Sequence, residues 1–287
     1  IPSINHFNVQ GASGGPTSLI NTDFVESIDI YSGAFPSEMY NAISGILDIQ
    51  QRDAHKDGIS SRFTLGATEA GLTIESPTGT NGNLILSTRK SFSEYLFKSI
   101  GLPVLPNYTD FQYRQKYRWA KHELIFIGLA ALDQSRVNIT EDPSESLLYN
   151  TGFIPDGDQK IYTGGINYKH YLDSGYYNLI ISTNHFDNKA IKSSLTNGAT
   201  LLDYSSIEQE SKTRFEHVFY YRSFRFKYGL NRDLHKFNVD QWSIIGTKNG
   251  LDTTDIAGTL KFNSYGAFIS MARPFINNKL IISLGTR

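Results

Sequence analysis

FQYRQKYRW, residues 111–119, shows how this chain folds. Aromatic side chains alternate along it with polar and basic ones. One face holds Phe111, Tyr113, Gln115, Tyr117 and Trp119, and the other holds Gln112, Arg114, Lys116 and Arg118. A period of two is typical of a β-strand, because successive side chains point to opposite faces of a sheet. The stretch therefore predicts a strand with one aromatic and one basic face.

The same alternation recurs along most of the chain. Residues 177–184, 212–222 and 224–231 each sort into two distinct faces. Eleven strands are predicted after residue 58, at about 60–67, 70–77, 83–92, 109–120, 122–137, 160–172, 176–191, 206–222, 224–241, 256–275 and 279–286.

The predicted connections alternate in length. Tight turns are expected at 79–82, 120–121, 173–175, 222–223 and 277–278, and long polar loops at 93–108, 138–159, 192–205 and 242–255. This pattern is typical of an outer-membrane barrel, which has short turns on one side and long loops on the other. Aromatic residues flank the tight turns, as an interfacial girdle would: Trp119, Tyr171, Tyr176, Tyr177, Tyr220, Tyr221, Phe224 and Phe275.

Two soluble architectures compete with this interpretation. A β-sandwich usually has strands of ~5–6 residues, whereas several strands predicted here are more than twice as long. A lipocalin-like barrel closes with about eight strands and would leave the remaining predicted strands unexplained. The favoured fold class is therefore all-β, a transmembrane antiparallel β-barrel.

Composition excludes several classes of function. Lys and Arg number 27 and Asp and Glu 28, so no overall basic field points to nucleic acid. Cysteine is absent, which excludes disulfides and thiolate metal sites. The longest apolar run, 124–132, is far shorter than the ~18 residues of a membrane helix. The N-terminus has no signal-peptide pattern, so we expect either a removed leader or a chain that begins inside a longer protein.

Two motifs could carry chemistry. Residues 11–15, GASGG, match the G-x-S-x-G pattern and make Ser13 a candidate nucleophile of a serine hydrolase. That pattern needs a strand before it, a helix after it and an α/β sheet, so a flexible glycine loop is favoured. The seven histidines show no paired-ligand spacing, and we expect no metal site and no cofactor.

In a barrel, the basic face of residues 111–119 could point either to the lipid or to the lumen. A charge facing lipid at the bilayer midplane costs ~2–4 kcal/mol, so Arg114, Lys116 and Arg118 are predicted to face the lumen. There they would pair with acidic residues such as Glu123 or with an element inside the barrel. Steering of a substrate is the alternative role.

Residues 32–54, SGAFPSEMYNAISGILDIQQRDA, differ in residue pattern from the long alternating strands that follow. Two short strand-like runs, 27–31 and 46–49, enclose a polar turn that is flanked by Gly33 and Gly45 and contains Tyr40. Both glycines would permit positive φ or close backbone approach.

This order resembles the end of the plug domain of TonB-dependent outer-membrane receptors. In that family a strand, a glycine, a helical turn with Tyr-Gly, a glycine pair and a closing strand precede the barrel. The counterparts here are residues 28–30, Gly33, Tyr40–Asn41, Ser44–Gly45 and residues 46–49, with Gln51–Arg52 in place of Thr-Lys. The sequence of this motif is similar to that found in the subgroup whose members carry an N-terminal carboxypeptidase-regulatory-like domain.

The resemblance implies both architecture and function. Residues 1–55 would be the C-terminal part of a plug, and residues 56–287 the first part of a barrel, about half of a 22-stranded wall. The function implied is uptake of a scarce, large solute (siderophore, cobalamin, glycan or peptide) across the outer membrane of a Gram-negative bacterium. The partners implied are the TonB complex, outer-membrane lipid, the solute and a surface lipoprotein, with no catalytic residue. A passive pore or a surface-binding scaffold is the alternative.

Two further expectations concern the site and the edges. The polar segment 5–18 would lie toward the long loops, so Asn5, His6, Phe7 and Gln10, with the basic residues 114, 116 and 118, are candidate ligand contacts. The last strand, 279–286, would run parallel to the first, whereas single-chain bacterial barrels have an even number of antiparallel strands. We therefore expect an open sheet in which strand 279–286 does not pair with strand 60–67.

Overall fold

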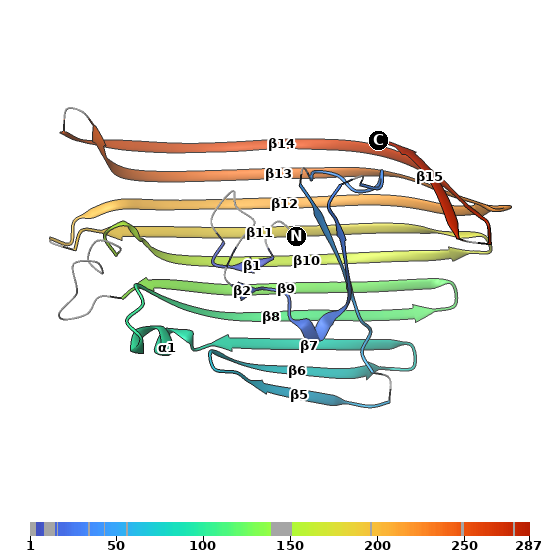
Figure 1. Ribbon diagram of the computed structural model, residues 1–287, viewed down its shortest axis with the longest axis horizontal. Helices are drawn as coiled ribbons and strands as arrows, with labels where there is room; N and C mark the ends of the chain where they lie inside the picture. The colour runs from blue at the N-terminus through green and yellow to red at the C-terminus, as the bar shows by residue number, and fades with distance from the viewer. Residues whose placement is uncertain are drawn as a thin grey trace.

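The computed structural model describes residues 4–8, 15, 17–33, 35–42, 44–55, 57–138, 151–195, 197–247, 250–277 and 279–287. Its main element is an 11-stranded antiparallel sheet, and two small two-stranded sheets lie in front of it (Figure 1). The predicted all-β class and the eleven strands after residue 58 are confirmed.

Each strand of the large sheet pairs with its sequence neighbour. In order they are β5 (Ser60–Leu65), β6 (Glu69–Thr78), β7 (Gly82–Ser91), β8 (Val104–Trp119), β9 (His122–Val137), β10 (Asp156–Leu172), β11 (Gly175–Ser193), β12 (Thr200–Tyr221), β13 (Phe224–Thr247), β14 (Gly250–Phe275) and β15 (Leu280–Thr286).

The sheet is open. Strands β5 and β15 form its two edges, and within the described residues they do not pair with each other. The expectation that strand 279–286 leaves the sheet unclosed is confirmed.

Two of the predicted long loops are wrong. Strand β12 already begins at Thr200, and β13 and β14 continue to Thr247 and from Gly250, so 200–205 and most of 242–255 are strand. Apolar side chains fall on both faces of these extensions, as at the adjacent Leu201 and Leu202 and the adjacent Ile244 and Ile245, so an apolar period of two is lost there. Connection 93–108 contains a short helix, α1 (Ser93–Ser99), and the start of β8. In the connection 138–159, residues 139–150 lie outside the described part.

The predicted tight turns at 79–82, 120–121, 173–175 and 222–223 are present, and residue 278 of the fifth lies outside the described residues. Ala120 and Arg222 open the β8–β9 and β12–β13 turns with φ of 46° and 53°, in the left-handed region. Gly175 ends the β10–β11 turn with φ of 135°, and a Cβ there would collide with the carbonyl oxygen of Val218. This turn therefore requires glycine.

The chain before residue 56 forms a separate layer, called here the N-terminal segment. Strand β1 (Asn5–His6) pairs with β2 (Thr17–Ser18), a 3-10 turn covers Thr22–Phe24, and β3 (Val25–Tyr31) pairs with β4 (Ile46–Gln51). The two predicted short strands are thus paired with each other. Figure 1 shows this segment against one face of the large sheet. A domain boundary at residue 55 stays a prediction.

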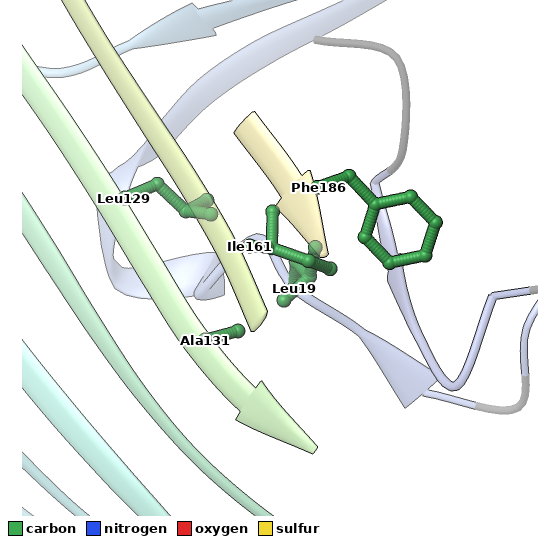
Figure 2. Packing of buried hydrophobic residues seen from close by; sticks show 5 residues of the cluster. All are labelled: Leu19, Leu129, Ala131, Ile161 and Phe186. Carbon is green, nitrogen blue, oxygen red and sulfur yellow. The ribbon is translucent and has the colours of Figure 1, made fainter. Parts of the chain in front are cut away.

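Apolar contacts fix the N-terminal segment to the sheet at two points. Leu19, which is fully buried, packs against a cluster from β9, β10 and β11 (Figure 2): Leu129, Ala131, Ile161 and Phe186. Phe24 is buried with Ala54 and with Ile85 of β7. Full burial of a leucine or phenylalanine is worth about 1.5–3 kcal/mol, so these contacts position the segment but are too few for a continuous core.

The two faces of the sheet are distinct. We call the face in contact with the N-terminal segment the inward face. On β8, Phe111 is 42% exposed whereas the neighbouring Gln112 is 2% exposed and bonds the N-terminal segment. On β8 the predicted division into an aromatic outward face and a polar inward face is therefore correct, whereas β9 to β11 also place apolar residues such as Leu129 and Ile161 on the inward face. Among the described residues, no helix has the length and apolarity needed to cross a membrane.

Candidate ligand site between the N-terminal segment and the sheet

A buried histidine joins the N-terminal segment to the sheet. The Nδ1 atom of His6 lies 2.6 Å from Oδ1 of Asp133, and its Nε2 atom lies 3.1 Å from Oδ2 of Asp110. The backbone N–H of Phe7 donates to Asp133 Oδ2 at 2.9 Å. An ionised carboxylate only accepts hydrogen bonds, so an imidazolium, which carries a proton on each ring nitrogen, satisfies both contacts of His6.

The surroundings of His6 favour that charge. Burial alone lowers the pKa of His6, but the hydrogen bonds and charges of Asp110 and Asp133 outweigh it and raise the pKa above its usual value. Arg89 of β7 pairs with Asp110 at 2.6 Å and also donates to the carbonyl oxygen of Leu19. The Tyr108 ring stacks on His6 at 3.9 Å. This group, called here the His6 cluster, ties β7, β8 and β9 to the segment.

The predicted basic face of β8 also contacts the segment. Asp53 accepts from Arg114 at 2.7 Å and from Lys116 at 2.9 Å. Burial would raise the pKa of Asp53, but these two cations hold it below its ordinary value. Lys116 also lies 3.3 Å from Glu123, the acidic partner anticipated from sequence. Arg118 is exposed, with its guanidinium 5.2 Å from the centre of the Tyr171 ring.

A third contact secures the turn between β3 and β4. The Tyr40 hydroxyl donates to Asp233 of β13 at 2.8 Å, and Asp233 has no exposed surface. Burial and this hydrogen bond raise the pKa of Tyr40 to about 12. Lys227 of β13 pairs with Glu38 at 3.1 Å. The turn is thus held by a buried acceptor and an ion pair.

The glycines of the plug-like motif behave differently from each other. A Cβ on Gly45 would lie 3.3 Å from the carbonyl oxygen of Tyr31, so the predicted close approach is present there. Gly33 does not have a positive φ, and among the described residues no atom lies within 4 Å of a Cβ there, so neither expected reason for a glycine is seen at this position. Instead Asn41, at the position of the family's glycine after tyrosine, has φ of 58°. Asparagine is among the few residues that tolerate this conformation.

A cavity of about 490 Å³ separates the tip of the N-terminal segment from the sheet. Phe7 and Asn8 line one side. Strands β9 to β13 and the connection before β10 line the other, mainly through Ser135, Ile154, Pro155, Gln159, Asn188, Leu202, Tyr204 and Gln241. These residues lie toward the strand ends that are opposite the tight turns. We call this space the tip cavity.

A larger cavity lies under β4. It measures about 730 Å³ and is bounded by β4, by Ile4 and Ile20, and by inward residues of β8 to β11 that include Arg114 and Asn167. The β3–β4 hairpin therefore does not pack tightly on the sheet, and space for solvent separates the two layers.

The candidate ligand contacts therefore lie in different places in the structure. Phe7 lines the tip cavity, His6 is fully buried in its cluster, and Asn5 belongs to β1. Arg114 and Lys116 are paired with Asp53 and do not line the tip cavity. Gln10 and the candidate nucleophile Ser13 lie outside the described residues. Ligand contact by any of these side chains stays a prediction.

Several residues that sequence reasoning missed hold the layers together. Asp110, Asp133 and Asp233 are acidic residues at inward positions of the strands, and each has at most 2% exposure. Charged residues that interrupt an otherwise regular strand face were the available signal. Within the described part of the chain, no group of three or more His, Asp or Glu residues is arranged to hold a metal ion.

Comparisons with known proteins identify the fold. No protein-family model and no curated protein matches the sequence. The chain is similar to the solved structure of the copper transporter OprC, with a TM-score of 0.65. It is also similar to two receptors from Acinetobacter baumannii, each with a TM-score of 0.61: BauA, the ferric preacinetobactin receptor, and the siderophore receptor PirA.

These likenesses concern the fold alone. Sequence identity is 11% in each, and the matches cover 94% of this chain but only 44%, 46% and 48% of OprC, BauA and PirA. The chain thus spans about half the length of these proteins. The expected fold, an antiparallel sheet that matches part of an outer-membrane β-barrel, is confirmed, and the assignment of residues 1–55 to an inner domain stays a prediction. The carboxypeptidase-regulatory-like subgroup stays an expectation.

Proposed function

We propose that this chain belongs to the TonB-dependent outer-membrane receptors and forms the end of the plug and the adjoining barrel wall of an energy-coupled importer. The solute is a scarce, large molecule that crosses the outer membrane of a Gram-negative bacterium. It binds at the plug tip and the inward face of the wall, and no reaction is performed on it. Neighbours in fold are a copper transporter and siderophore receptors, which supports a transport role.

One observation carries this proposal: the N-terminal segment is fixed to the inward face mostly by polar contacts. Asp53, Asp110 and Asp233 each mark a place where a hydrogen-bonded group joins segment to sheet. A hydrogen bond to a charged group contributes about 1.5–3 kcal/mol net, because water can replace either partner once the two layers separate. A layer held in this way can be displaced stepwise into a wet lumen, whereas a layer sealed by an apolar core cannot.

An energy-coupled importer of this kind needs partners beyond this chain. The TonB complex of the inner membrane would supply the force that displaces the plug. The outward aromatic face, with Phe111 and Trp119 each 42% exposed, suits contact with lipid. A surface lipoprotein that delivers the solute remains a candidate partner.

The test compares the full-length receptor with a variant that lacks residues 4–55. Both are reconstituted into planar lipid bilayers, and the ionic current through single channels is measured. We expect no current from the full-length receptor and large, steady currents from the deletion variant. A Lys121→Ala variant, altered in an exposed turn where Lys121 pairs with Asp173, serves as a control and should stay closed. Steady current through the intact receptor would instead identify a passive pore.

Energy coupling is tested in cells that express the full-length receptor. Radiolabelled ferric enterobactin, cobalamin and maltohexaose are offered with and without a protonophore that collapses the proton-motive force. Accumulation of a probe that the protonophore abolishes supports coupled uptake. Accumulation that the protonophore leaves unchanged contradicts it.

A further inference from the structure

Four amides and two aromatic rings line the tip cavity, together with small and aliphatic residues. Asn8, Gln159, Asn188 and Gln241 supply carboxamides, and Phe7 and Tyr204 supply rings. A cavity of about 490 Å³ falls within the usual ~300–1,000 Å³ of ligand pockets. The lining therefore offers hydrogen-bond donors and acceptors at fixed places between apolar surfaces.

Among the described residues, the lining has no charge left for a ligand. Asp133 is the acidic residue in it, and His6 and the Phe7 N–H already occupy both of its oxygens. Lys189 contributes to the boundary, but it lies between Asn188 and Ala190 on β11, both of which line the cavity, so its own side chain points outward. An anionic ligand would require arginine or lysine groups directed at it. A neutral ligand fits this lining better.

Two acceptors in the lining have no partner. Asn8 is 5% exposed, and its Oδ1 atom makes no hydrogen bond. The Oε1 atom of Gln159 is also buried and unpaired, although its Nε2 donates to the Asn8 carbonyl at 2.6 Å and to Asn188 Oδ1 at 3.1 Å. A buried acceptor without a donor is unfavourable. Donors supplied by a ligand would remove that cost.

We propose that the tip cavity binds a neutral, hydroxyl-rich solute of the carbohydrate class, and this inference rests on the proposed uptake function. Sugar hydroxyls donate to the unpaired amide oxygens of Asn8 and Gln159 and accept from amide N–H groups. The apolar faces of sugar rings pack on Phe7 and Tyr204. Backbone groups of β9 to β13 are already paired within the sheet, so the free strand edge by which extended peptides are often bound is absent from this part of the lining.

Binding is measured by isothermal titration calorimetry with the full-length receptor in detergent, which requires neither TonB nor a membrane potential. The probes are maltohexaose, cellohexaose and xylohexaose as neutral oligosaccharides, with ferric enterobactin and a neutral hexapeptide for comparison. We expect at least one oligosaccharide to bind more tightly than the other two classes. Absence of binding by all three oligosaccharides would overturn the proposal.

The Gln159→Leu variant tests the cavity itself. It removes both the unpaired acceptor and the donor that orients Asn8, and we expect oligosaccharide affinity to fall at least tenfold. Asn167→Leu is the matched control, because Asn167 is also an inward amide of β10 with an unpaired oxygen but borders the cavity under β4. It should leave affinity unchanged, and thermal unfolding of both variants checks that they fold. An equal loss in both variants would place the binding site elsewhere.

The binding and conductance experiments separate the two proposals. If ferric enterobactin or the peptide binds and the oligosaccharides do not, the substrate class is wrong and the uptake function stands. If the intact receptor conducts ions as a passive pore, the uptake function fails whatever the calorimetry shows.

Discussion

Removing the charge of His6 should release the N-terminal segment from the sheet. In a His6→Gln variant, Asp133 keeps only the Phe7 N–H as a strong donor, whereas Asp110 keeps Arg89. Loss of one partner from a buried ion pair costs about 3–5 kcal/mol. Because ~1.4 kcal/mol corresponds to a factor of ten, exchange of the backbone amides in residues 5–19 should accelerate roughly a hundredfold or more.

The assay is hydrogen–deuterium exchange with mass spectrometry on the full-length receptor in detergent. His185→Gln is the control, because His185 bonds Gln209 and has no recorded bond to the described N-terminal segment. Its exchange in residues 5–19 should match the wild type. Unchanged protection of these residues in His6→Gln would refute the view that the imidazolium anchors the segment.

The same cluster predicts a dependence on pH. The groups that face His6 are Asp110 and Tyr108 from β8, Asp133 from β9 and Arg89, through Asp110, from β7. The folded pKa of His6 is raised above the unfolded value of ~6.5, so its stabilisation is complete below that value. It is lost as pH rises through the folded pKa. Protection of residues 5–19, corrected for intrinsic exchange, should therefore decrease as pH rises above ~6.5 in wild type but not in His6→Gln, and an increase with pH would contradict this.

Three other substitutions test the turns and anchors, each by thermal unfolding in detergent. Tyr40→Phe should cost about 1–3 kcal/mol by leaving buried Asp233 short of a donor, and an unchanged melting temperature would show that the bond is dispensable. Asn41→Gly should be neutral and Asn41→Val destabilising by about 1–2 kcal/mol, because φ is 58°; equal melting temperatures would argue against that conformation. Gly175→Ala should destabilise by at least about 1–3 kcal/mol through collision with Val218, and no change would contradict the turn geometry.

Strands were predictable wherever one face is apolar and the other polar. The basic face of residues 112–118 and the tight turn at Ala120 followed from period two and from the cost of charge in lipid. The ends of β12, β13 and β14 were missed because apolar side chains fall on both of their faces, as at Leu201 and Leu202, although the hydrogen-bonded ladder between the strands continues there. Such a ladder leaves no periodic trace in the sequence.

The anchors of the N-terminal segment were predictable only in part. The inward position of Arg114 followed from its strand, but its partner Asp53 lies in another layer. His6 meets Asp110 and Asp133 across separations of 104 and 127 residues. Pairings this distant depend on how the segment rests on the sheet, and no local pattern encodes that placement. Phe7 was identified because a polar, glycine-rich segment suits adaptable recognition.

Strand length grows from β5 to β14 and then falls to 7 residues in β15, so the rim of the sheet has an uneven height. Strands β5 to β7 have 6–10 residues, whereas β12 to β14 have 22–26 (Figure 1). At ~3.4 Å per residue and a tilt of ~40°, the longest rises roughly 65–70 Å, against an apolar band of ~25 Å. In a receptor of this class, the tall side would stand out of the membrane as a one-sided screen. A solute would then reach the tip cavity by passing over the short strands β5 to β7, and the long strands β12 to β14 would bound the opposite side of its path.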